Sequence, residues 1–547
     1  MSDDRRSPSA GASRSAAIGV LSSDVFDIVV IGGGITGAGI AREAALAQQR
    51  VALLERDDFA SGTSSRSSRL VHGGVRYLEH GHLSLVFESS RERHLLMSLA
   101  PHLVRPLAFT WPVYRGARVP RWKVRAGLTL YDVLSMFRHT QRHRALSARD
   151  VMAAEPALNR DGLLGGARYW DAATDDTRLT LANALAAREA GAVVLNHIAV
   201  TGGLRTQGNA RLHGVRAHDA LSGAEFDVRA RVVVNATGPW SDATAALTGE
   251  SNMPSVLGSA GAHIAVPRQR LGNHEAVTMV SPIDGRVTFA LPAGAHAIIG
   301  TTERVARVGP DAIRASELDV QYLLGTVNAL FPNAQLVLDD VVAAWAGIRP
   351  LATSRAGTHG ANSASREHAI MTRDDGLVSV TGGKLTTYRA MAADVLSRIA
   401  APSSESRSAL LPGGDFDSRD RLLHDARETV HDAAVAERLV HGYGSRWRSV
   451  WSYAQRDAML KHRLVDDLPY LLAEVPYAVE RELACTLSDV LIRRTHVAFE
   501  TRDNGRGAAR RIAPLMAALL QWSVSDVEHQ LSAYHLDAGR IFGIDKT

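Results

Sequence analysis

The chain has 547 residues and a formal net charge of +5, with 46% apolar and 22% charged residues and a pI near 9.4. This length and composition predict more than one globular domain and a large core. The single cysteine, Cys485, excludes a disulfide framework and a thiolate metal site, and it favours a reducing, intracellular environment. With 5% aromatic residues and no zinc-finger or RNP-like motif, nucleic-acid binding is disfavoured.

Residues 1–24 are rich in Ser, Ala, Gly and Arg and lack an apolar run, so they predict a disordered tail rather than a secretory signal. No run of about 18 apolar residues occurs, which excludes a membrane-spanning helix.

Residues 28–55 follow the order strand, glycine turn, helix, strand, acid. The β-branched run at 28–31 predicts a strand buried on both faces, a helix should extend to about Gln49, and 51–54 predicts a second strand. In the turn, Gly32 allows the tight bend, Gly34 lets the backbone approach a pyrophosphate, and Gly37 lets helix and strand pack closely. Glu55, 23 residues beyond Gly32, can accept hydrogen bonds from a ribose. The pattern predicts a dinucleotide site and leaves FAD and NAD open.

A loop of small hydroxylated residues follows at 59–81, with His72-Gly73-Gly74 and Arg76-Tyr77. It suits packing against a large planar ligand. Here the sequence resembles the FAD-dependent glycerol-3-phosphate dehydrogenases. The resemblance is strong over 25–415 and continues through 232–240, 261–264, 298–303, 346–351, 381–389 and 411–414. The segment Thr-Gly-Gly-Lys-Leu-Thr-Thr-Tyr-Arg at 381–389 is its most specific match.

The resemblance implies an α/β fold with a Rossmann-type, glutathione-reductase-like FAD-binding domain. We expect that domain to be discontinuous within 25–411, with an antiparallel-sheet substrate domain inserted at roughly 251–345. Alternating short runs over 255–305 agree with such a sheet. Residues 412–547 should form a helical C-terminal domain, in which Leu483, Leu487, Val490 and Leu491 are spaced as one apolar helix stripe.

By the same resemblance, the cofactor is non-covalent FAD, and we expect neither a metal nor NAD. The implied cofactor-binding residues lie in the glycine turn, the ribose acid and its neighbour, the hydroxylated loop and two returning segments: Gly32, Gly34, Ile35, Thr36, Gly37, Glu55, Arg56, Thr63, Ser64, Ser65, Ser68, Leu70, His72, Gly73, Gly74, Ala236, Thr237, Gly238, Gly382, Gly383, Lys384, Leu385 and Thr386.

The family's reaction oxidises sn-glycerol 3-phosphate to dihydroxyacetone phosphate by hydride transfer from C2 to flavin N5, and a quinone takes the electrons. An arginine fork suits the phosphate, and the resemblance implies Arg349 as the first choice and Arg366 as the second. Arg76 and Tyr77 complete the pocket wall.

Lys384 can stabilise negative charge on the reduced flavin. His263 is favoured over His72 as the base, while arginine-assisted or water-mediated proton transfer stays open. One departure concerns the position before Gly261, where the family usually has a basic residue and this chain has Ala260.

Residues 115–144 place eight Lys or Arg around a short apolar centre. This arrangement predicts docking on an anionic membrane surface, and a core helix with basic flanks is the alternative. We therefore expect a cytoplasmic homodimer, peripheral on the inner face of the cell membrane. Two other functions stay open: an oxygen-using glycerol-3-phosphate, amine or 2-hydroxy-acid oxidase on the same fold, and a non-catalytic flavin-binding scaffold.

Overall fold

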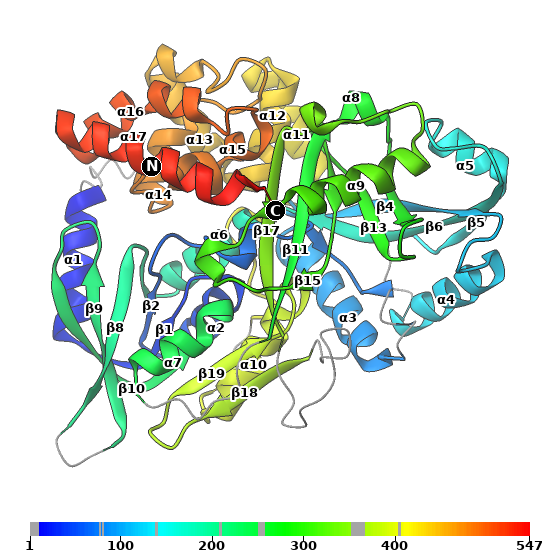
Figure 1. The fold of residues 1–547 in the computed structure, drawn as a ribbon. Coiled ribbons are helices and arrows are strands. Elements are labelled where there is room, and N and C mark those ends of the chain that lie inside the picture. The colour runs from blue at the N-terminus through cyan, green and yellow to red at the C-terminus, as the bar shows by residue number, and fades with distance from the viewer. Residues whose placement is uncertain are drawn as a thin grey trace.

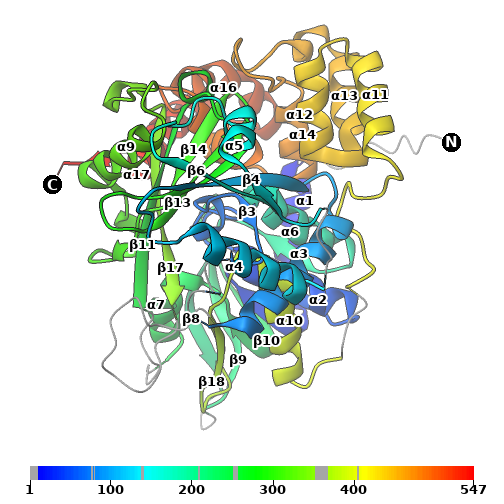
Figure 2. The ribbon, with the colours of Figure 1, turned by 90° about the vertical axis from the view of Figure 1, so that its right-hand side faces the viewer.

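The structure is a computed structural model that describes residues 10–75, 78, 81–136, 141–206, 210–249, 257–351, 367–402 and 406–546. Three predicted substrate residues, Arg76, Tyr77 and Arg366, lie outside the described residues. Two large sheets stand side by side, and a helical C-terminal domain packs over both (Figures 1 and 2). This arrangement confirms the predicted fold class.

The first sheet has eight strands in the order β18-β19-β10-β1-β2-β7, with β9 beside β10 and β8 beside β9. Strands β1, β2, β7, β10 and β19 run parallel. The bounds are β1 Val25–Ile31, β2 Val51–Leu54, β7 Val193–Leu195, β8 Ile198–Arg205, β9 Leu212–Asp219, β10 Glu225–Asn235, β18 His368–Thr372 and β19 Val378–Gly382.

Strand β1 is buried on both faces, as its unbroken apolar run predicts. Ile28 and Val30 pack in one cluster with helices α2 (Ile35–Leu46), α6 (Asp176–Glu189) and α10 (Tyr388–Arg398). Val29 and Ile31 pack in another cluster, which contains side chains of β8 and β9. The carboxyl ends of β1, β2, β10 and β19 therefore meet at one edge of a rigid sheet.

The second sheet has ten strands in the order β15-β11-β14-β13-β12-β4-β6-β3, with β17 beside β11 and β5 beside β6. The bounds are β3 Leu70–Val71, β4 Val104–Tyr114, β5 Arg144–Leu146, β6 Leu163–Thr174, β11 Leu257–Pro267, β12 Ala276–Val280, β13 Val287–Ala293, β14 His296–Gly300, β15 Arg304–Val305 and β17 Ala343–Leu351.

The antiparallel pairing of β11, β12, β13 and β14 agrees with the prediction for 255–305. The predicted limits of 251–345 are too narrow, however, because β3 to β6 join the same sheet from residues 70–174. The parallel pairing of β4 with β12 makes this connection, and it depends on contacts between distant segments.

The prediction of a disordered tail is wrong for residues 10–23, which form helix α1 (Ala10–Ser23). The helix is held by tertiary contacts that composition does not reveal. Leu21 is fully buried in the cluster that contains β8 and β9. Arg14 pairs with Asp219 at 2.7 Å and donates to the carbonyl oxygen of Asn196 at 2.8 Å.

The C-terminal domain is helical, as predicted. Its helices are α11 Arg419–Val430, α12 Ala433–Tyr443, α13 Trp447–Arg456, α14 Glu474–Arg481, α15 Val497–Glu500, α16 Arg506–Leu520 and α17 Val524–Phe542. The predicted stripe from Leu483 to Leu491 does not lie on one helix. Leu483 has a φ of +60° and lies between α14 and the π-helix Asp489–Arg494, so it breaks the register.

The remaining elements are α3 Leu83–Leu99, α4 Arg121–Leu134, α5 Ala148–Ala154, α7 Ser241–Leu247, α8 Arg268–Leu271, α9 Glu317–Leu330, β16 Ala315–Ser316 and β20 Ile544–Asp545. The short helical turns are η1 Thr63–Ser65, η3 Gly238–Trp240, η4 Pro310–Ala312, η5 Leu338–Asp340, η6 Leu385–Thr387, η7 Gly444–Arg446 and η8 Ala458–Lys461.

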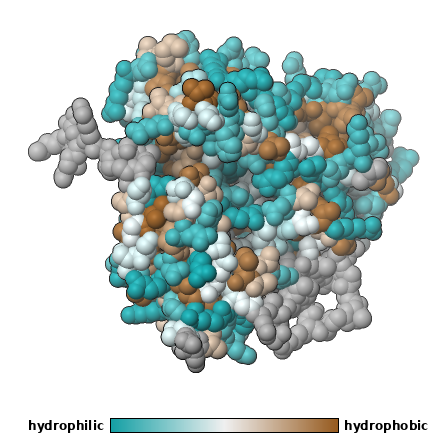
Figure 3. All heavy atoms as spheres, turned by 60° about the vertical axis from the view of Figure 1, so that its left-hand side comes forward, coloured by the Kyte–Doolittle hydropathy of each residue, from teal (hydrophilic) through white to brown (hydrophobic). Residues whose placement is uncertain are grey.

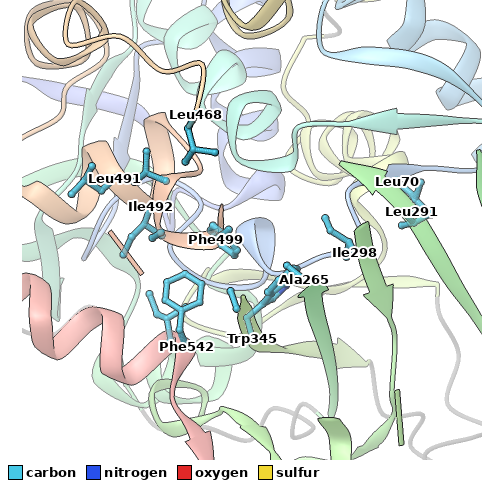
Figure 4. Close-up of a cluster of buried hydrophobic side chains, with 14 of the residues drawn as sticks. Leu70, Ala265, Leu291, Ile298, Trp345, Leu468, Leu491, Ile492, Phe499 and Phe542 are labelled. Atoms are coloured by element: carbon cyan, nitrogen blue, oxygen red, sulfur yellow. The ribbon is translucent and has the colours of Figure 1, made fainter. Parts of the chain in front are cut away.

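Apolar packing joins the C-terminal domain to the second sheet. Phe499 of that domain packs against Trp345 of β17, with ring centroids 5.1 Å apart (Figure 4). Phe542 packs in turn against Phe499, with ring centroids 4.8 Å apart. Ile298 and Ala265 belong to the same cluster. The surface in Figure 3 is mostly hydrophilic, with hydrophobic residues in small separate groups.

Buried ion pairs join the C-terminal domain to the first sheet. Asp58, in the loop after β2, accepts from Arg493 at 2.5 Å and from Arg494 at 2.6 Å. Two further pairs, Arg178–Glu482 at 2.6 Å and Asp175–His496 at 2.8 Å, fix the start of α6. The loop that follows the predicted ribose acid is thus held in place by the C-terminal domain.

Candidate flavin and substrate site

A cavity with an empty volume of about 1180 Å³ opens where the carboxyl ends of β1, β2, β10 and β19 meet. Fifteen of the predicted cofactor residues line it: Gly32, Gly34, Ile35, Thr36, Glu55, Arg56, Thr63, Ser64, Ala236, Thr237, Gly238, Gly382, Gly383, Lys384 and Leu385. The cavity therefore unites predicted residues that lie up to 353 residues apart in the chain, from Gly32 to Leu385.

The fingerprint glycines have different physical causes. Gly32 has a φ of +102°, and a Cβ on Gly37 would lie 1.9 Å from the carbonyl oxygen of Gly32, so backbone geometry demands both. Gly34 has an ordinary φ of −71°, and its Cβ would meet only Ser64 Oγ, at 3.3 Å. No contact within the described part of the chain requires glycine at 34, whereas a phosphate lying against the backbone would. This cradle fits a dinucleotide.

Glu55 lies at the end of β2 with both carboxylate oxygens held. Oε2 accepts from the amide of Gly33 at 2.6 Å, and Oε1 accepts from that of Asp57 at 2.9 Å. Burial, reinforced by the charge of Asp57, raises the pKa of Glu55 to about 7. A ribose hydroxyl that donated to this carboxylate would favour its charged form.

The hydroxylated loop packs between the cavity and the second sheet. Thr63 Oγ1 donates to the carbonyl oxygen of Ile348 at 2.6 Å. The amide of His72 donates to Thr386 Oγ1 at 3.2 Å, and the amide of Gly73 to Asp171 at 3.1 Å. Eight predicted cofactor residues do not line the cavity: Gly37, Ser65, Ser68, Leu70, His72, Gly73, Gly74 and Thr386.

Arg349 lies on β17 beside β11. Its Nη2 donates to Thr301 Oγ1 at 3.0 Å. A Cβ on Gly261 would lie 2.5 Å from that same nitrogen, so the glycine makes room for the guanidinium. Pro350, the next residue, lines the cavity together with Lys384. The arginine itself does not line the cavity but directly precedes a residue that does.

His263 is buried beneath the hydroxylated loop. Its Nε2 lies 2.9 Å from Ser68 Oγ, and its ring stacks on Trp345 with centroids 5.6 Å apart. Burial, together with the charges of Arg349 and Arg69, lowers the pKa of His263 to about 3. The imidazole is therefore neutral at ordinary pH. Of the residues predicted to act on substrate, the structure brings His263 and Arg349 together on neighbouring strands.

The uncharged position before Gly261 does not face this site. Side chains alternate along β11, and Ala260 lies in the cluster beneath α9, whereas His263 faces Trp345. A missing basic residue at 260 therefore leaves the face that carries Gly261 and His263 unchanged.

Lys384 follows Gly382 and Gly383, whose φ values are +77° and +80°. The turn η6 and helix α10 begin directly after it. Its Nζ donates to Ser89 Oγ of α3 at 3.2 Å. The cation is thus held at the wall of the cavity.

Sequence reasoning missed several residues of the site. Ile198 and Val200 of β8 line the cavity, and Thr301 holds Arg349. Trp240 also lines the cavity, and the sequence identifies it only as the last residue of the segment 232–240. An apolar pair in an ordinary strand carries no signal for a cofactor, since only the fold places it there.

Known proteins share both parts of this architecture. Residues 27–389 match the FAD dependent oxidoreductase family, and residues 404–527 match the C-terminal domain of alpha-glycerophosphate oxidase. The chain is 38% identical over 96% of its length to glycerol-3-phosphate dehydrogenase 2 of Mycobacterium bovis, covering 90% of that protein. The chain belongs to the FAD-dependent glycerol-3-phosphate dehydrogenase family.

Two further comparisons agree. The glycerol-3-phosphate dehydrogenase of Synechocystis is 35% identical over 94% of this chain and 96% of that protein. The crystal structure of the enzyme from Bacillus halodurans, complexed with FAD, superposes with a TM-score of 0.80 at 29% identity, covering 97% of this chain and 98% of that one. FAD is therefore the cofactor, as predicted, and the chain is an FAD-dependent oxidoreductase.

Proposed function

We propose that this protein oxidises sn-glycerol 3-phosphate to dihydroxyacetone phosphate and passes the electrons to a quinone. The observation that carries the proposal is the arginine built into β17. Arg349 is held by Thr301, is given room by Gly261, and lies next to a residue that lines the FAD cavity. A fixed guanidinium fork at this place suits a phosphate group. The names of the curated relatives support the same substrate.

The protein's residues bind the substrate and move one proton. FAD, when bound, would supply a two-electron acceptor for the hydrogen that leaves C2 as hydride. Arg349 holds the phosphate, and Nε2 of His263 takes the proton of the C2 hydroxyl as the ketone forms. Burial is the main cause of the low pKa of His263; a bound phosphate offsets the second cause, the positive charge of Arg349, and so raises that pKa. Lys384 places a positive charge beside the cavity.

The test is anaerobic addition of glycerol 3-phosphate to the yellow protein. We expect the flavin absorbance to bleach, while glycerol, which lacks phosphate, leaves the absorbance unchanged. Protein that stays yellow with glycerol 3-phosphate would refute the substrate. A quinone analogue should then restore the colour faster than oxygen does. If oxygen alone reoxidises the flavin and yields stoichiometric peroxide, the acceptor is oxygen and the protein is an oxidase.

The proposed quinone acceptor fits docking on a membrane. Helix α4 has an inward face, where Val124, Leu128 and Tyr131 are buried, so the core-helix alternative holds for half of it. Its other face exposes Trp122 by 72% and Val133 by 51%. Helix α3 runs beside it (Figure 2), and Tyr131 accepts from Arg93 of α3 at 3.1 Å. The two helices together expose Leu83, Phe87, Trp122, Leu130, Val133 and, directly after α4, Met136.

Basic side chains flank these apolar residues. The exposed ones are Arg115, Arg118, Arg121, Lys123, Arg125, Arg142 and Arg144. Each can contribute about 1 kcal/mol near an anionic surface, and salt weakens the attraction. No helix in the described part of the chain is long and apolar enough to cross a bilayer. We propose attachment to the inner face of the cell membrane through the α3–α4 surface, and a homodimer stays an expectation.

The docking test is co-sedimentation with anionic and neutral vesicles at low salt. Wild type should sediment with anionic vesicles, whereas a variant with Arg121, Lys123 and Arg125 changed to Glu should stay in the supernatant. The matched control changes three exposed arginines of the C-terminal domain, Arg421, Arg427 and Arg456, to Glu. If both variants lose binding equally, net charge rather than the α3–α4 surface causes the attachment.

A further inference from the structure

A loop from the second sheet reaches the rim of the FAD cavity. It connects β15 to β16 and carries Asp311 in the turn η4. Asp311 Oδ1 accepts from Arg56 Nη2 at 2.8 Å, and Asp311 Oδ2 accepts from the indole nitrogen of Trp240 at 3.0 Å. The guanidinium of Arg56 also lies over the Trp240 ring, 5.2 Å from its centroid. One carboxylate thus ties together two residues that are 184 positions apart.

Arg56 and Trp240 line the cavity, whereas Asp311 does not. Arg56 follows Glu55, and its side chain is 46% exposed, so it lies at the boundary between cavity and solvent. The Trp240 ring covers the hydroxylated loop at Gly62, where a Cβ would lie 2.7 Å from the ring. Asp311 therefore holds two rim residues from the outside.

The loop itself is anchored away from the first sheet. Arg304 pairs with Asp319 at 3.2 Å, and its Nη2 donates to the carbonyl oxygen of Arg314 at 2.8 Å. Ile313 is 2% exposed in the cluster beneath α9. Arg540 of α17 approaches Asp311 at 3.9 Å. The loop is anchored to the second sheet, whereas Arg56 and Trp240 follow strands of the first sheet. Opening the rim at Asp311 therefore means breaking contacts between the two sheets.

We propose that Asp311, Arg56 and Trp240 form a clasp that closes the rim of the cavity and retains FAD. In this role Asp311 is a positioning residue. It keeps Arg56 and Trp240 in place, and the clasp opens when FAD leaves. The proposal rests on FAD binding alone and does not depend on the substrate or on the electron acceptor.

The experiment measures FAD release from holoenzyme without substrate. The yellow protein is diluted far below its FAD dissociation constant, and the rise in free-flavin fluorescence gives the dissociation rate. Losing a charge-assisted hydrogen bond and a part-exposed ion pair predicts about fivefold to thirtyfold faster release from Asp311→Ala. High salt should speed release from wild type more than from the variant, since it screens the pair.

The chain offers a matched control in Asp284, in the turn between β12 and β13. Like Asp311 it is a half-exposed carboxylate that accepts from an aromatic side chain, Tyr322 at 2.8 Å, and pairs with an arginine, Arg286 at 3.5 Å. It does not line the cavity. Asp284→Ala should release FAD at the wild-type rate. A rate for Asp311→Ala within twofold of both would overturn the proposal.

A double-mutant cycle separates a clasp from two independent contacts. If the Arg56–Asp311 pair acts as a unit, Arg56→Ala combined with Asp311→Ala should release FAD little faster than the faster single variant. Rate increases that multiply in the double variant would show that each residue acts alone, and they would refute the clasp. Thermal unfolding of the apoproteins checks that all variants fold.

Discussion

Replacing Gly34 and Gly37 separately by alanine should damage two different properties, although both glycines belong to one turn. At Gly34 the backbone is extended, with φ −71° and ψ 177°, and only Ser64 Oγ lies near the new methyl group. The unliganded fold should gain about 0.4–1 kcal/mol because the unfolded chain loses freedom. FAD binding should weaken, since the methyl group occupies the cradle. A misfit of about 1–3 kcal/mol predicts a dissociation constant roughly 5- to 150-fold higher.

At Gly37 the methyl group would lie 1.9 Å from the carbonyl oxygen of Gly32. Helix α2 and the end of β1 must separate to accept it, and the apoprotein should lose about 1–3 kcal/mol of stability. Fluorescence titration with FAD and urea unfolding of the apoproteins measure the two effects. Normal FAD affinity in Gly34→Ala, or equal destabilisation of both apoproteins, would refute this reading of the turn.

Three more predictions follow from the site and its supports. Arg349→Ala should lower kcat/KM for glycerol 3-phosphate about tenfold to a hundredfold, because a hydrogen bond to a charged group contributes about 1.5–3 kcal/mol. Steady-state kinetics measure this, and an equal loss of kcat/KM for glycerol would contradict it. The pKa of Glu55 is about 7 in the unliganded protein and ribose favours the carboxylate, so FAD affinity should fall as the pH drops below 7; titrations from acid to neutral pH should show this for wild type and a flat profile for Glu55→Gln. Asp58→Asn should destabilise the protein by about 3–5 kcal/mol, because Arg494 stays buried without its carboxylate and Arg493 keeps only Asp489. Chemical unfolding measures it, and Asp545→Asn, at a half-exposed carboxylate that pairs with Arg314, should cost less than about 1 kcal/mol and is the control.

Local sequence predicted the parts of the fold that local physics determines. Strands β1 and β2 and the glycine turn were found because a parallel strand buried on both faces reads as an unbroken apolar run. The extent of the second sheet was not found, since β4 joins it through pairing with β12, about 170 residues away. Helix α1 was read as disordered because its few contacts, such as Leu21 and Arg14, are long-range.

The candidate site divides in the same way. Residues within short motifs, such as Glu55, Lys384 and Gly34, were found because spacing places them. Thr301 and Asp311 were missed as site residues, because Arg349 reaches Thr301 from a distant strand of the same sheet and Arg56 reaches Asp311 from the other sheet. Prediction from one sequence segment at a time cannot find such contacts.

In a chimera that joins residues 1–411 of this chain to the C-terminal domain of a relative, three pairs have one residue in each part: Asp58–Arg494, Arg178–Glu482 and Asp175–His496. Each pair forms only if the relative supplies a matching partner. An apolar seam can adapt to a changed partner by small shifts, whereas a charge left buried at such a seam has no substitute. Exchange of this domain among relatives should therefore succeed only when both halves of each pair travel with it. The graft therefore has to include the relative's residues in the loop after β2 and at the start of α6 together with its C-terminal helices, because these segments hold the other half of each pair.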